Sequence, residues 1–331
     1  MDLDYLLQVE DLKTTFYTDD AIIRAVDGVS FNVKPGEVVG LVGESGCGKS
    51  VISLSIMRLI MYPPGKIEGG KILFDNQDLL KLDDRQMRKI RGNDIAMIFQ
   101  EPMTSFNPVY KIGDQVSEAI RLHQGLEKED AWKEAARMLE MVGIPRPGEV
   151  INDYPHQLSG GMRQRAMIAM ALSCNPRLLI ADEPTTALDV TIQAQILELM
   201  KDIKERINTA IIFITHDLGV IAEMADHVVV MYAGKIVENT DVHRLFKEPL
   251  HPYTAGLIKS KPILEEEKAV LEFIPGSVPN PSEMPQGCAF HPRCPEVMDI
   301  CLEQMPDLLE PKPQHLVRCW LYQEEKARGV K

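Results

Sequence analysis

The sequence predicts an α/β fold with a doubly wound, mainly parallel sheet. Five short apolar runs rich in Val and Ile lie within the first 235 residues, at 37–42, 94–99, 177–181, 210–215 and 227–232. Runs that do not alternate between apolar and polar residues are typical of strands covered on both faces, as in parallel sheets. Stretches with helical periodicity lie between them, at 50–61, 112–123, 128–142, 161–172 and 191–207. This alternation favours the α/β class.

Length and charge limit the possible classes of function. The chain has 331 residues, which suits one large α/β unit with an appendage, or about two domains. It carries 49 acidic and 36 basic residues, so its formal net charge is −13. This balance argues against a protein whose main task is to bind nucleic acid, because such proteins neutralise phosphates with Lys and Arg.

Signals for membrane insertion and export are missing from the sequence. No apolar run approaches the roughly 18 residues that a membrane-spanning helix requires. The start, Met1 to Asp4, lacks the basic and apolar regions of a signal peptide. We therefore expect a cytoplasmic protein.

Two regions interrupt the alternation of strands and helices. Residues 104–158 are mainly helical, which indicates a helical subdomain inserted at about 104–170 into a domain of residues 1–255. Prolines become dense beyond residue 250, and proline fixes φ and lacks a backbone donor. Residues 256–331 are therefore expected to form a turn-rich extension with little regular structure.

Four of the six cysteines lie in this extension, at Cys288, Cys294, Cys301 and Cys319. In a reducing compartment such a group indicates a metal or iron–sulfur site more often than two disulfides. The other two, Cys47 and Cys174, are far apart and are expected to be small buried residues.

The segment Gly43–Ser50 carries a phosphate-binding motif. It reads GESGCGKS, which fits the phosphate-loop pattern G-x-x-x-x-G-K-[ST], and it lies between a predicted strand and a predicted helix. Its glycines let backbone N–H groups converge on phosphate oxygens, and the helix start adds positive potential. Lys49 would reach the β- and γ-phosphates, and the Ser50 hydroxyl would bind Mg²⁺. The alternative is a glycine-rich turn without nucleotide.

Polar side chains follow three other predicted strands. Asp182 and Glu183 end the strand at 177–181, and the carboxyl ends of strands are where open α/β sheets bind ligands. Asp182 suits Mg²⁺, and Glu183 suits a general base that polarises the attacking water. His216 follows the strand at 210–215 and could orient water or stabilise transition-state charge. Gln100 follows the strand at 94–99, and its amide can serve Mg²⁺ or water.

A second anion-binding helix start is predicted at Leu158–Arg165. Ser159 can cap the helix that follows, and Gly160 and Gly161 expose its first backbone amides. A simple capped helix explains the serine but not the paired glycines. Two helix ends that can hold phosphate, in a chain with one phosphate loop, indicate a site shared between two chains.

Together these segments resemble the ATP-binding cassette (ABC) family over about residues 6–245. The motifs that carry the resemblance occur in the family's order: Gly43–Ser50, Gln100, Leu158–Gln164, Asp182-Glu183, Ala187-Leu188-Asp189 and His216. The resemblance implies two cassettes that dimerise head to tail around two ATP molecules, each phosphate loop facing the other chain's Ser-Gly-Gly segment. Glu183 and His216 are both present, so this chain's half-site is expected to hydrolyse ATP.

The resemblance also implies a role for each matched residue. Catalytic roles fall to Glu183, His216 and Gln100, and Mg²⁺ binding falls to Ser50, Gln100 and Asp182. Contacts to ATP are expected from Phe16, Tyr17, Gly43, Ser45, Gly46, Cys47, Gly48, Lys49, Ser50, Val51, Gln100, Asp182 and His216. Contacts to the partner's ATP are expected from Ser159, Gly160, Gly161, Met162 and Gln164.

Two positions depart from the family's pattern. Met162 stands where many members have glutamine, and Val51 replaces a common second hydroxyl residue, although its backbone N–H could still reach the α-phosphate. The family stacks adenine on an aromatic residue near the N-terminus. Spacing favours Phe16, with Tyr17 as the neighbouring candidate.

The C-terminal extension resembles that of peptide-importer cassettes. The diagnostic stretch is 287–295, GCAFHPRCP, which is similar to the dipeptide/oligopeptide (with nickel) subfamily and to the first of its two cassette subunits. The implied partners are a second, homologous cassette in a heterodimer, two integral-membrane permeases and, indirectly, an extracytoplasmic peptide-binding protein, with no nucleic acid. The implied location is the cytoplasmic face of the cell membrane.

The spacing of the four cysteines separates several possibilities. Five, six and seventeen residues lie between successive cysteines, whereas structural zinc sites use tighter pairs. Some members of the resembled subfamily carry a [4Fe–4S] cluster, which suits the wider spacing and is favoured here. Zinc, with His291 or His315 as a substitute ligand, and free thiols or disulfides are the alternatives.

The sequence is also compatible with three other functions. A nickel-chelate importer would use the same type of cassette. A soluble ABC ATPase without a membrane partner is a second alternative, although the chain has neither a long coiled coil nor a second cassette. In a third, the cysteine extension is a redox sensor that regulates the ATPase.

Overall fold

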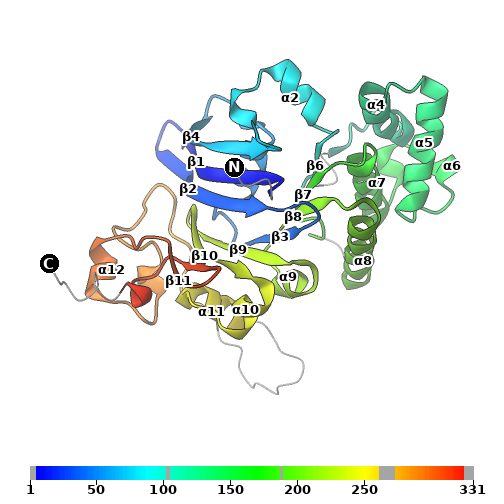
Figure 1. Ribbon diagram of the computed structural model, residues 1–331. Helices are drawn as coiled ribbons and strands as arrows, with labels where there is room; N and C mark the ends of the chain where they lie inside the picture. The colour runs from blue at the N-terminus through cyan, green and yellow to red at the C-terminus, as the bar shows by residue number, and fades with distance from the viewer. Residues whose placement is uncertain (1–4, 102–104, 187–188, 261–272, 324–331) are drawn as a thin grey trace. The chain divides into compact units, whose positions relative to one another are not determined.

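The computed structural model describes residues 5–101, 105–186, 189–260 and 273–323. The chain divides into two compact units. The first unit comprises Met1–Leu6, Val33–Val38 and Asp78–Ile214, and the second comprises Leu7–Asn32, Val39–Gln77 and Thr215–Lys331. Figure 1 shows the elements of both units in sequence colours.

Parallel strands form the sheet of the first unit. Strands β6 (Ile95–Ile98), β7 (Leu178–Asp182) and β8 (Ala210–Thr215) lie side by side in the order β6-β7-β8. Ile95 pairs with Leu178, and Leu178 pairs with Ala210. All three strands are buried along their whole length, as the uninterrupted apolar runs predicted.

Helices make up most of the rest of the first unit. Each expected helix occurs within one residue of its predicted start, at α4 (Ile112–Gln124), α5 (Lys128–Met141), α7 (Gly160–Leu172) and α8 (Val190–Ile207). The shorter elements are η1 (Leu79–Lys81), α2 (Asp84–Ile90), α6 (Pro147–Val150) and η2 (Pro155–Gln157). Helices α4, α5 and α7 pack against one another within the predicted helical insert. Buried apolar side chains recur at helical spacing on these helices, at Val116 and Ile120 on α4 and at Ala135 and Met138 on α5.

The main sheet of the second unit is mixed rather than parallel. Strand β3 (Val38–Val42) runs parallel to β9 (His227–Tyr232), and β10 (Lys235–Asp241) returns antiparallel to β9. The turn between β9 and β10 is Ala233-Gly234, with φ of +47° and +80°, which matches the positive φ values of a tight two-residue hairpin. Strands β12 (His315–Val317) and β11 (Leu309–Lys312) continue the sheet beyond β10, again antiparallel.

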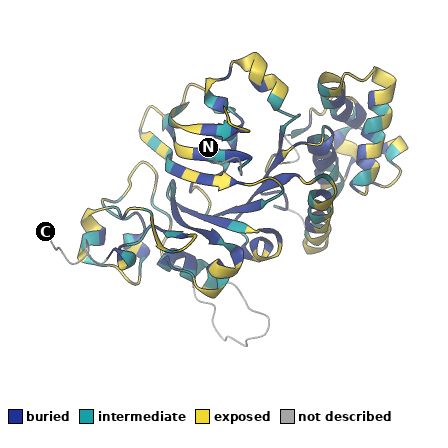
Figure 2. Cartoon of the chain, viewed as in Figure 1, coloured by how far each residue is buried: buried dark blue, intermediate teal, exposed yellow. Residues whose placement is uncertain are grey.

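A separate antiparallel sheet in the second unit was not predicted. Its order is β2 (Ile22–Val33), β1 (Leu7–Tyr17), β4 (Gly65–Phe74) and β5 (Gln77–Asp78). Buried and exposed residues mix along these strands, whereas β3 and β9 are buried almost throughout (Figure 2). One-sided burial breaks up the apolar runs by which the other strands were recognised.

Short helices complete the second unit, namely α1 (Lys49–Ile56), α9 (Leu218–Met224), α10 (Val242–Lys247), α11 (Pro252–Lys259), η3 (His291–Arg293), α12 (Asp299–Glu303) and η4 (Trp320–Tyr322). Helix α1 ends five residues before the predicted stretch does, where Arg58 takes a positive φ of +50°. The expected domain boundary at residue 255 falls inside α11, which runs on to Lys259. Among the described residues, none of the helices has the length and apolarity that crossing a membrane would need.

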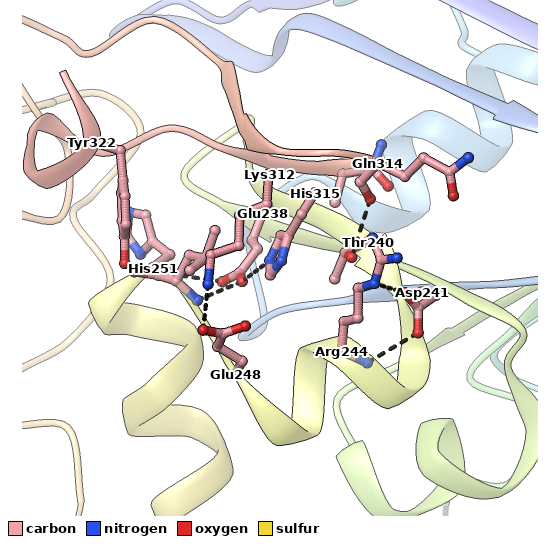
Figure 3. A network of polar contacts seen from close by, with 12 residues as sticks. Glu238, Thr240, Asp241, Arg244, Glu248, His251, Lys312, Gln314, His315 and Tyr322 are labelled. Atoms are coloured by element: carbon pink, nitrogen blue, oxygen red, sulfur yellow. Dashed lines mark hydrogen bonds and ion pairs between the residues drawn. The ribbon is translucent and has the colours of Figure 1, made fainter.

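The C-terminal extension is tied to the second unit by a buried carboxylate. Glu238 on β10 is fully buried and accepts hydrogen bonds from the backbone N–H groups of Leu250 and His251, at 2.7 and 2.9 Å. His315 Nε2 on β12 lies 2.7 Å from the same carboxylate (Figure 3). Thr240 and Tyr322 add bonds to backbone carbonyls on either side. Strand pairing and this network therefore order the end of the extension, which was expected to have little regular structure.

Candidate nucleotide-binding site

The predicted phosphate loop connects β3 to α1 in the second unit. Gly48 occupies the N-cap position of α1 with φ of +99°, and a Cβ there would lie 2.2 Å from the carbonyl oxygen of Ala25. At Gly43 a Cβ would lie 2.3 Å from the carbonyl oxygen of Met231. A Cβ on Gly46, at φ of +81°, would have no atom of the described residues within 4 Å. Close packing thus excludes side chains at two glycines, and open space lies beside the third, as a loop that accepts a phosphate requires.

Lys49, near the C-terminal end of the loop, binds the loop's backbone through its side chain. Its side chain is 5% exposed, and Nζ donates to the carbonyl oxygens of Gly43 and Glu44, at 2.8 and 3.1 Å. Cys47 is fully buried in the same loop, and burial raises the pKa of its thiol, with the Lys49 charge opposing the shift. Cys47 is therefore the small buried residue that the sequence predicted. Its side chain is buried, so only its backbone N–H is expected to contact a phosphate.

The two adjacent carboxylates lie at the end of β7 in the first unit, as predicted. Asp182 is 3% and Glu183 9% exposed. Glu183 has a positive φ of +46°, and its carboxylate accepts hydrogen bonds from Gln100 Nε2 at 3.2 Å and Thr186 Oγ1 at 2.8 Å. The candidate base and the glutamine that follows β6 are thus directly bonded. Thr186 was not identified from the sequence, although it lies one turn after Glu183.

His216 directly follows β8 and is exposed. The next residue, Asp217, caps α9 by accepting hydrogen bonds from the backbone N–H groups of Gly219 and Val220. This cap ends the strand and starts the helix within two residues, so the histidine is held in a short turn at the strand end. The predicted placement of His216 at the end of a strand is confirmed.

The Ser-Gly-Gly segment forms the start of α7 in the first unit. Ser159 Oγ accepts a hydrogen bond from the Met162 N–H at 3.3 Å, which is the predicted N-cap. A Cβ on Gly160 would meet nothing within 4 Å, whereas one on Gly161 would lie 3.1 Å from Ile192 Cγ2 on α8. Gly161 therefore has a packing reason to be glycine, and Gly160 has none among the described residues.

Gln164 points into its own chain rather than outward. It is 2% exposed, and its Nε2 donates to the carbonyl oxygen of Pro184 at 2.6 Å. This bond links α7 to the residue after Glu183. Of the segment expected to contact a partner's ATP, Ser159 and Gly160 are exposed and Gly161 and Met162 are half-buried, so the exposed part is its first two residues. The motif segment Ala187-Leu188 lies outside the described residues.

The two candidate adenine-stacking residues lie at the end of β1. Phe16 is half-buried and packs beside Gly65, where an added Cβ would lie 2.8 Å from the Phe16 ring. Tyr17 is exposed, and its hydroxyl donates to Glu68 Oε1 at 2.5 Å. Both rings are available at one strand end, and their assignment stays a prediction.

The expected metal centre is not supported by the structure. All four cysteines of the extension are described, and they are free thiols. Within the described part of the chain, no group of three or more His, Cys, Asp or Glu side chains could hold a metal ion. The two candidate substitutes are engaged elsewhere, His291 Nδ1 with the Cys288 carbonyl and His315 with Glu238. Strand pairing and hydrogen bonds hold the described part of the extension.

The structure adds contacts to the phosphate loop that the sequence did not suggest. Glu44 carries an ion pair with Arg293 of the extension, and its backbone N–H donates to the Tyr253 hydroxyl at 2.9 Å. Arg293 lies 249 positions away along the chain, so no motif spacing could have related the two.

Comparison with known families agrees with this geometry. A family model described as ABC transporter matches residues 26–186, and one described as oligopeptide/dipeptide transporter, C-terminal region, matches residues 237–301.

Two curated relatives match nearly the whole chain. The oligopeptide transport ATP-binding protein AppD of Bacillus subtilis (strain 168) is 56% identical over 97% of this chain and 98% of its own. The dipeptide transport ATP-binding protein DppD of the same strain is 51% identical over 99% of this chain and 98% of its own.

A solved structure gives the same fold. The dimeric ATP-binding cassette MJ0796, bound to ADP and Pi in a post-hydrolysis state, superposes with a TM-score of 0.64 at 30% identity, covering 71% of this chain and 98% of that chain. The phosphate loop and the carboxylate pair at the end of β7 define an ATPase of the P-loop type. The chain belongs to the ABC transporter ATP-binding proteins, and within them to the oligopeptide/dipeptide type.

Proposed function

We propose that the chain is the ATP-hydrolysing subunit of a peptide importer, in which ATP binding closes a pair of cassettes and hydrolysis reopens them. The observation that carries the proposal is the presence, in one chain, of an intact ATPase motif set and of the C-terminal region shared with peptide transport proteins. Relatives named for oligopeptide and dipeptide transport, each matching almost end to end, support peptides as the cargo.

The chemical step is in-line attack of water on the γ-phosphate, with Glu183 as the base. Its carboxylate is largely buried and accepts bonds from Gln100 and Thr186, which orient it. Lys49 would exchange its two carbonyl partners for β- and γ-phosphate oxygens, and His216 would donate to the γ-phosphate. Mg²⁺ would be held by Ser50, Asp182 and Gln100, whose oxygens are the ligands that this ion prefers.

The exposed Ser159 and Gly160 support a site shared between two cassettes. Helix α7 presents its first amides there, and a helix start of this kind can hold a phosphate brought by a second chain. We propose that the second chain is a homologous cassette, that two permeases receive the motion, and that an extracytoplasmic peptide-binding protein delivers the cargo. The chain would then lie at the cytoplasmic face of the cell membrane. Phe16 or Tyr17 would stack on adenine.

A [4Fe–4S] cluster at the four cysteines is a narrower proposal. Burial, followed by the charge of other cysteines in the group, raises the pKa of Cys294 to about 11 and that of Cys319 to about 12. The backbone N–H of Cys288 donates to the Cys301 carbonyl oxygen at 2.8 Å, which brings two of the four residues together. A four-iron cluster has corners farther apart than the ligands of one zinc ion. Iron and sulfide analysis of anaerobically purified protein, with its visible absorption spectrum, tests this; protein without iron refutes it.

Transport by the reconstituted complex tests the main proposal. The chain, its companion cassette and the permeases are placed in proteoliposomes, and ATP-dependent uptake of labelled dipeptides, longer peptides and nickel chelates is compared. Peptide uptake that stops in Glu183→Gln supports the proposal. Uptake of nickel chelates alone would identify nickel chelates, and not peptides, as the cargo. Failure of the chain to co-purify with any integral membrane protein would favour an ABC ATPase that works without a transporter.

A further inference from the structure

Glu44, the second residue of the phosphate loop, is fixed at three separate points. Its backbone N–H donates to the Tyr253 hydroxyl at 2.9 Å, and its carbonyl oxygen accepts from Lys49 Nζ at 3.1 Å. Its carboxylate accepts two hydrogen bonds from Arg293, Nη1 to Oε2 at 2.9 Å and Nη2 to Oε1 at 3.1 Å. Glu44, whose carbonyl oxygen accepts a hydrogen bond from Lys49, is therefore also bound through its carboxylate by Arg293 of the C-terminal extension.

The Arg293 side chain is buried in the extension and makes several hydrogen bonds. Its side chain is 6% exposed, whereas that of Glu44 is 28% exposed. Besides the paired bonds to Glu44, its Nε donates to the carbonyl oxygen of Pro275 at 2.9 Å. Arginine presents its donors in a planar fork that matches a carboxylate, so this geometry fixes the direction of the Glu44 side chain as well as its distance.

An aromatic cluster packs against the Arg293 side chain. The Arg293 guanidinium carbon lies 5.8 Å from the centre of the Tyr232 ring, within cation–π range. The Tyr232 ring contacts those of Tyr253 and Phe290 at centroid distances of 4.7 and 5.2 Å, and all three are at most 2% exposed. Tyr253, which binds the Glu44 backbone, and Phe290, which lies three residues before Arg293, thus belong to one packed core.

We propose that Arg293 is a positioning residue for ATP binding, acting through Glu44 on the phosphate loop. The turn of the extension that contains Cys288 and Cys294 would then be a working part of the ATP site, and not only an appendage. The inference rests on contacts within the second unit and does not depend on which cargo is transported or on whether the cysteines bind a cluster.

The physical reason is preorganisation of the loop. A loop that already holds its bound conformation loses less conformational entropy when ATP arrives, so its affinity is higher. Without Arg293, the Glu44 carboxylate becomes free to turn into solvent, and the Glu44 carbonyl that Lys49 uses becomes less restrained. The loss should appear in ATP affinity rather than in the hydrolytic step, because the candidate base Glu183 has its own hydrogen-bond partners.

Equilibrium binding of a fluorescent ATP analogue to the full-length chain tests the proposal, alongside KM and kcat of the assembled ATPase. For Arg293→Gln we expect Kd and KM for ATP to rise about tenfold, which corresponds to the loss of one charge-assisted hydrogen bond. We expect kcat to change less than about twofold. Arg293→Lys, which keeps the charge without the fork, should show a smaller rise. In the pair Arg293→Gln and Glu44→Gln, the double variant should show no more loss than either single one, because both remove the same interaction.

Arg318 provides a matched control in the same extension. It is partly buried and donates to the carbonyl oxygens of Ile236 and Pro306, at 2.9 and 3.1 Å. Arg318→Gln should lower the thermal unfolding midpoint and leave Kd and KM for ATP unchanged. Unchanged ATP binding in a folded Arg293→Gln variant, or the same rise in Kd for Arg318→Gln, would overturn the proposal. If Arg293→Gln does not fold, Kd and KM for ATP are measured for Glu44→Gln and Arg293→Lys instead. A rise in both constants supports the proposal, and unchanged constants in both variants overturn it.

Discussion

Gln100 Nε2 lies 3.2 Å from Glu183 Oε2, so the two polar residues that follow β6 and β7 are hydrogen-bonded to each other. The glutamine follows the strand that leads into the helical insert, and the glutamate follows the strand that carries Asp182. The hydrogen bond therefore links the residue at the entrance to the insert with the carboxylate that is proposed to activate water.

Replacing Glu183 by Gln should abolish hydrolysis while ATP still binds. The amide has almost the same shape and can keep a hydrogen bond to Thr186, but it cannot accept a proton from water. We expect kcat to fall at least about 100-fold, the size of a lost general base. ATPase turnover and equilibrium ATP binding are measured on the same preparation. Asp299→Asn, which changes an acid far along the chain at the start of α12, controls for a general effect of lost charge. Turnover above one-tenth of the wild-type rate would remove Glu183 from its role.

Thr186 should act as a positioning residue for this base. Its hydroxyl donates to Glu183 Oε2 at 2.8 Å, and hydrogen bonds to a carboxylate favour the charged form. Thr186→Val removes the donor and keeps the shape. The acid limb of the pH profile of kcat should therefore move to higher pH, with kcat at its maximum falling about tenfold. Thr186→Ser, which restores the hydroxyl, should restore the profile. A uniform fall in rate with no shift of the acid limb would indicate a structural role only.

The sequence predicted the parts of the fold that are marked by continuous apolar runs or by motifs. Strands β3, β6, β7, β8 and β9 are buried along nearly their whole length, so their composition alone reveals them. Strand β1 mixes buried and exposed residues and has a register shift between Glu10 and Lys13, so its period is disturbed. The β11–β12 hairpin is short and follows a Pro-rich stretch, which favoured turns.

For the site, the sequence located each group at a strand or helix end but did not predict how the groups contact one another. Gln100, Glu183 and Ser159 are where the motifs placed them. The contacts from Thr186 to Glu183 and from Arg293 to Glu44 depend on side-chain directions and on long-range packing. The four cysteines show the reverse case, because their clustering in sequence predicted a metal centre for which no group of ligands is found among the described residues.

Acid should weaken the second unit through His251. This side chain is fully buried, and burial lowers its pKa to about 4 although the charge of Glu238 opposes the shift. Because the pKa in the unfolded chain is higher, about 6.5, the unfolded state binds more protons between these values, and stability falls as pH falls through this window. From pH 7 to pH 5 the expected loss from this residue is about 2 kcal/mol.

His251→Asn tests that contribution by removing the titration and keeping the helix cap. His251 Nδ1 accepts from the Tyr253 N–H at 3.0 Å, and an asparagine oxygen can take its place. Urea unfolding at pH 7 and pH 5 should show a smaller loss for the variant, by about 2 kcal/mol. His243→Asn, at an exposed position of α10, should lose as much as the wild type. Equal losses in all three proteins would contradict the buried, neutral state of His251.

Gly160 and Gly161 allow the shared site to be tested without disturbing the fold. A Cβ on Gly160 has open space around it, and alanine favours helices over glycine, so Gly160→Ala should leave the unfolding midpoint unchanged or slightly raised. If a second chain brings a phosphate to these amides, the same methyl group obstructs it, and ATPase activity of the assembled pair should fall at least about tenfold. In Gly161→Ala the new methyl must push Ile192 aside, so that variant should lose stability as well. A stable Gly160→Ala variant with full activity in the assembled pair would show that no phosphate approaches this helix start.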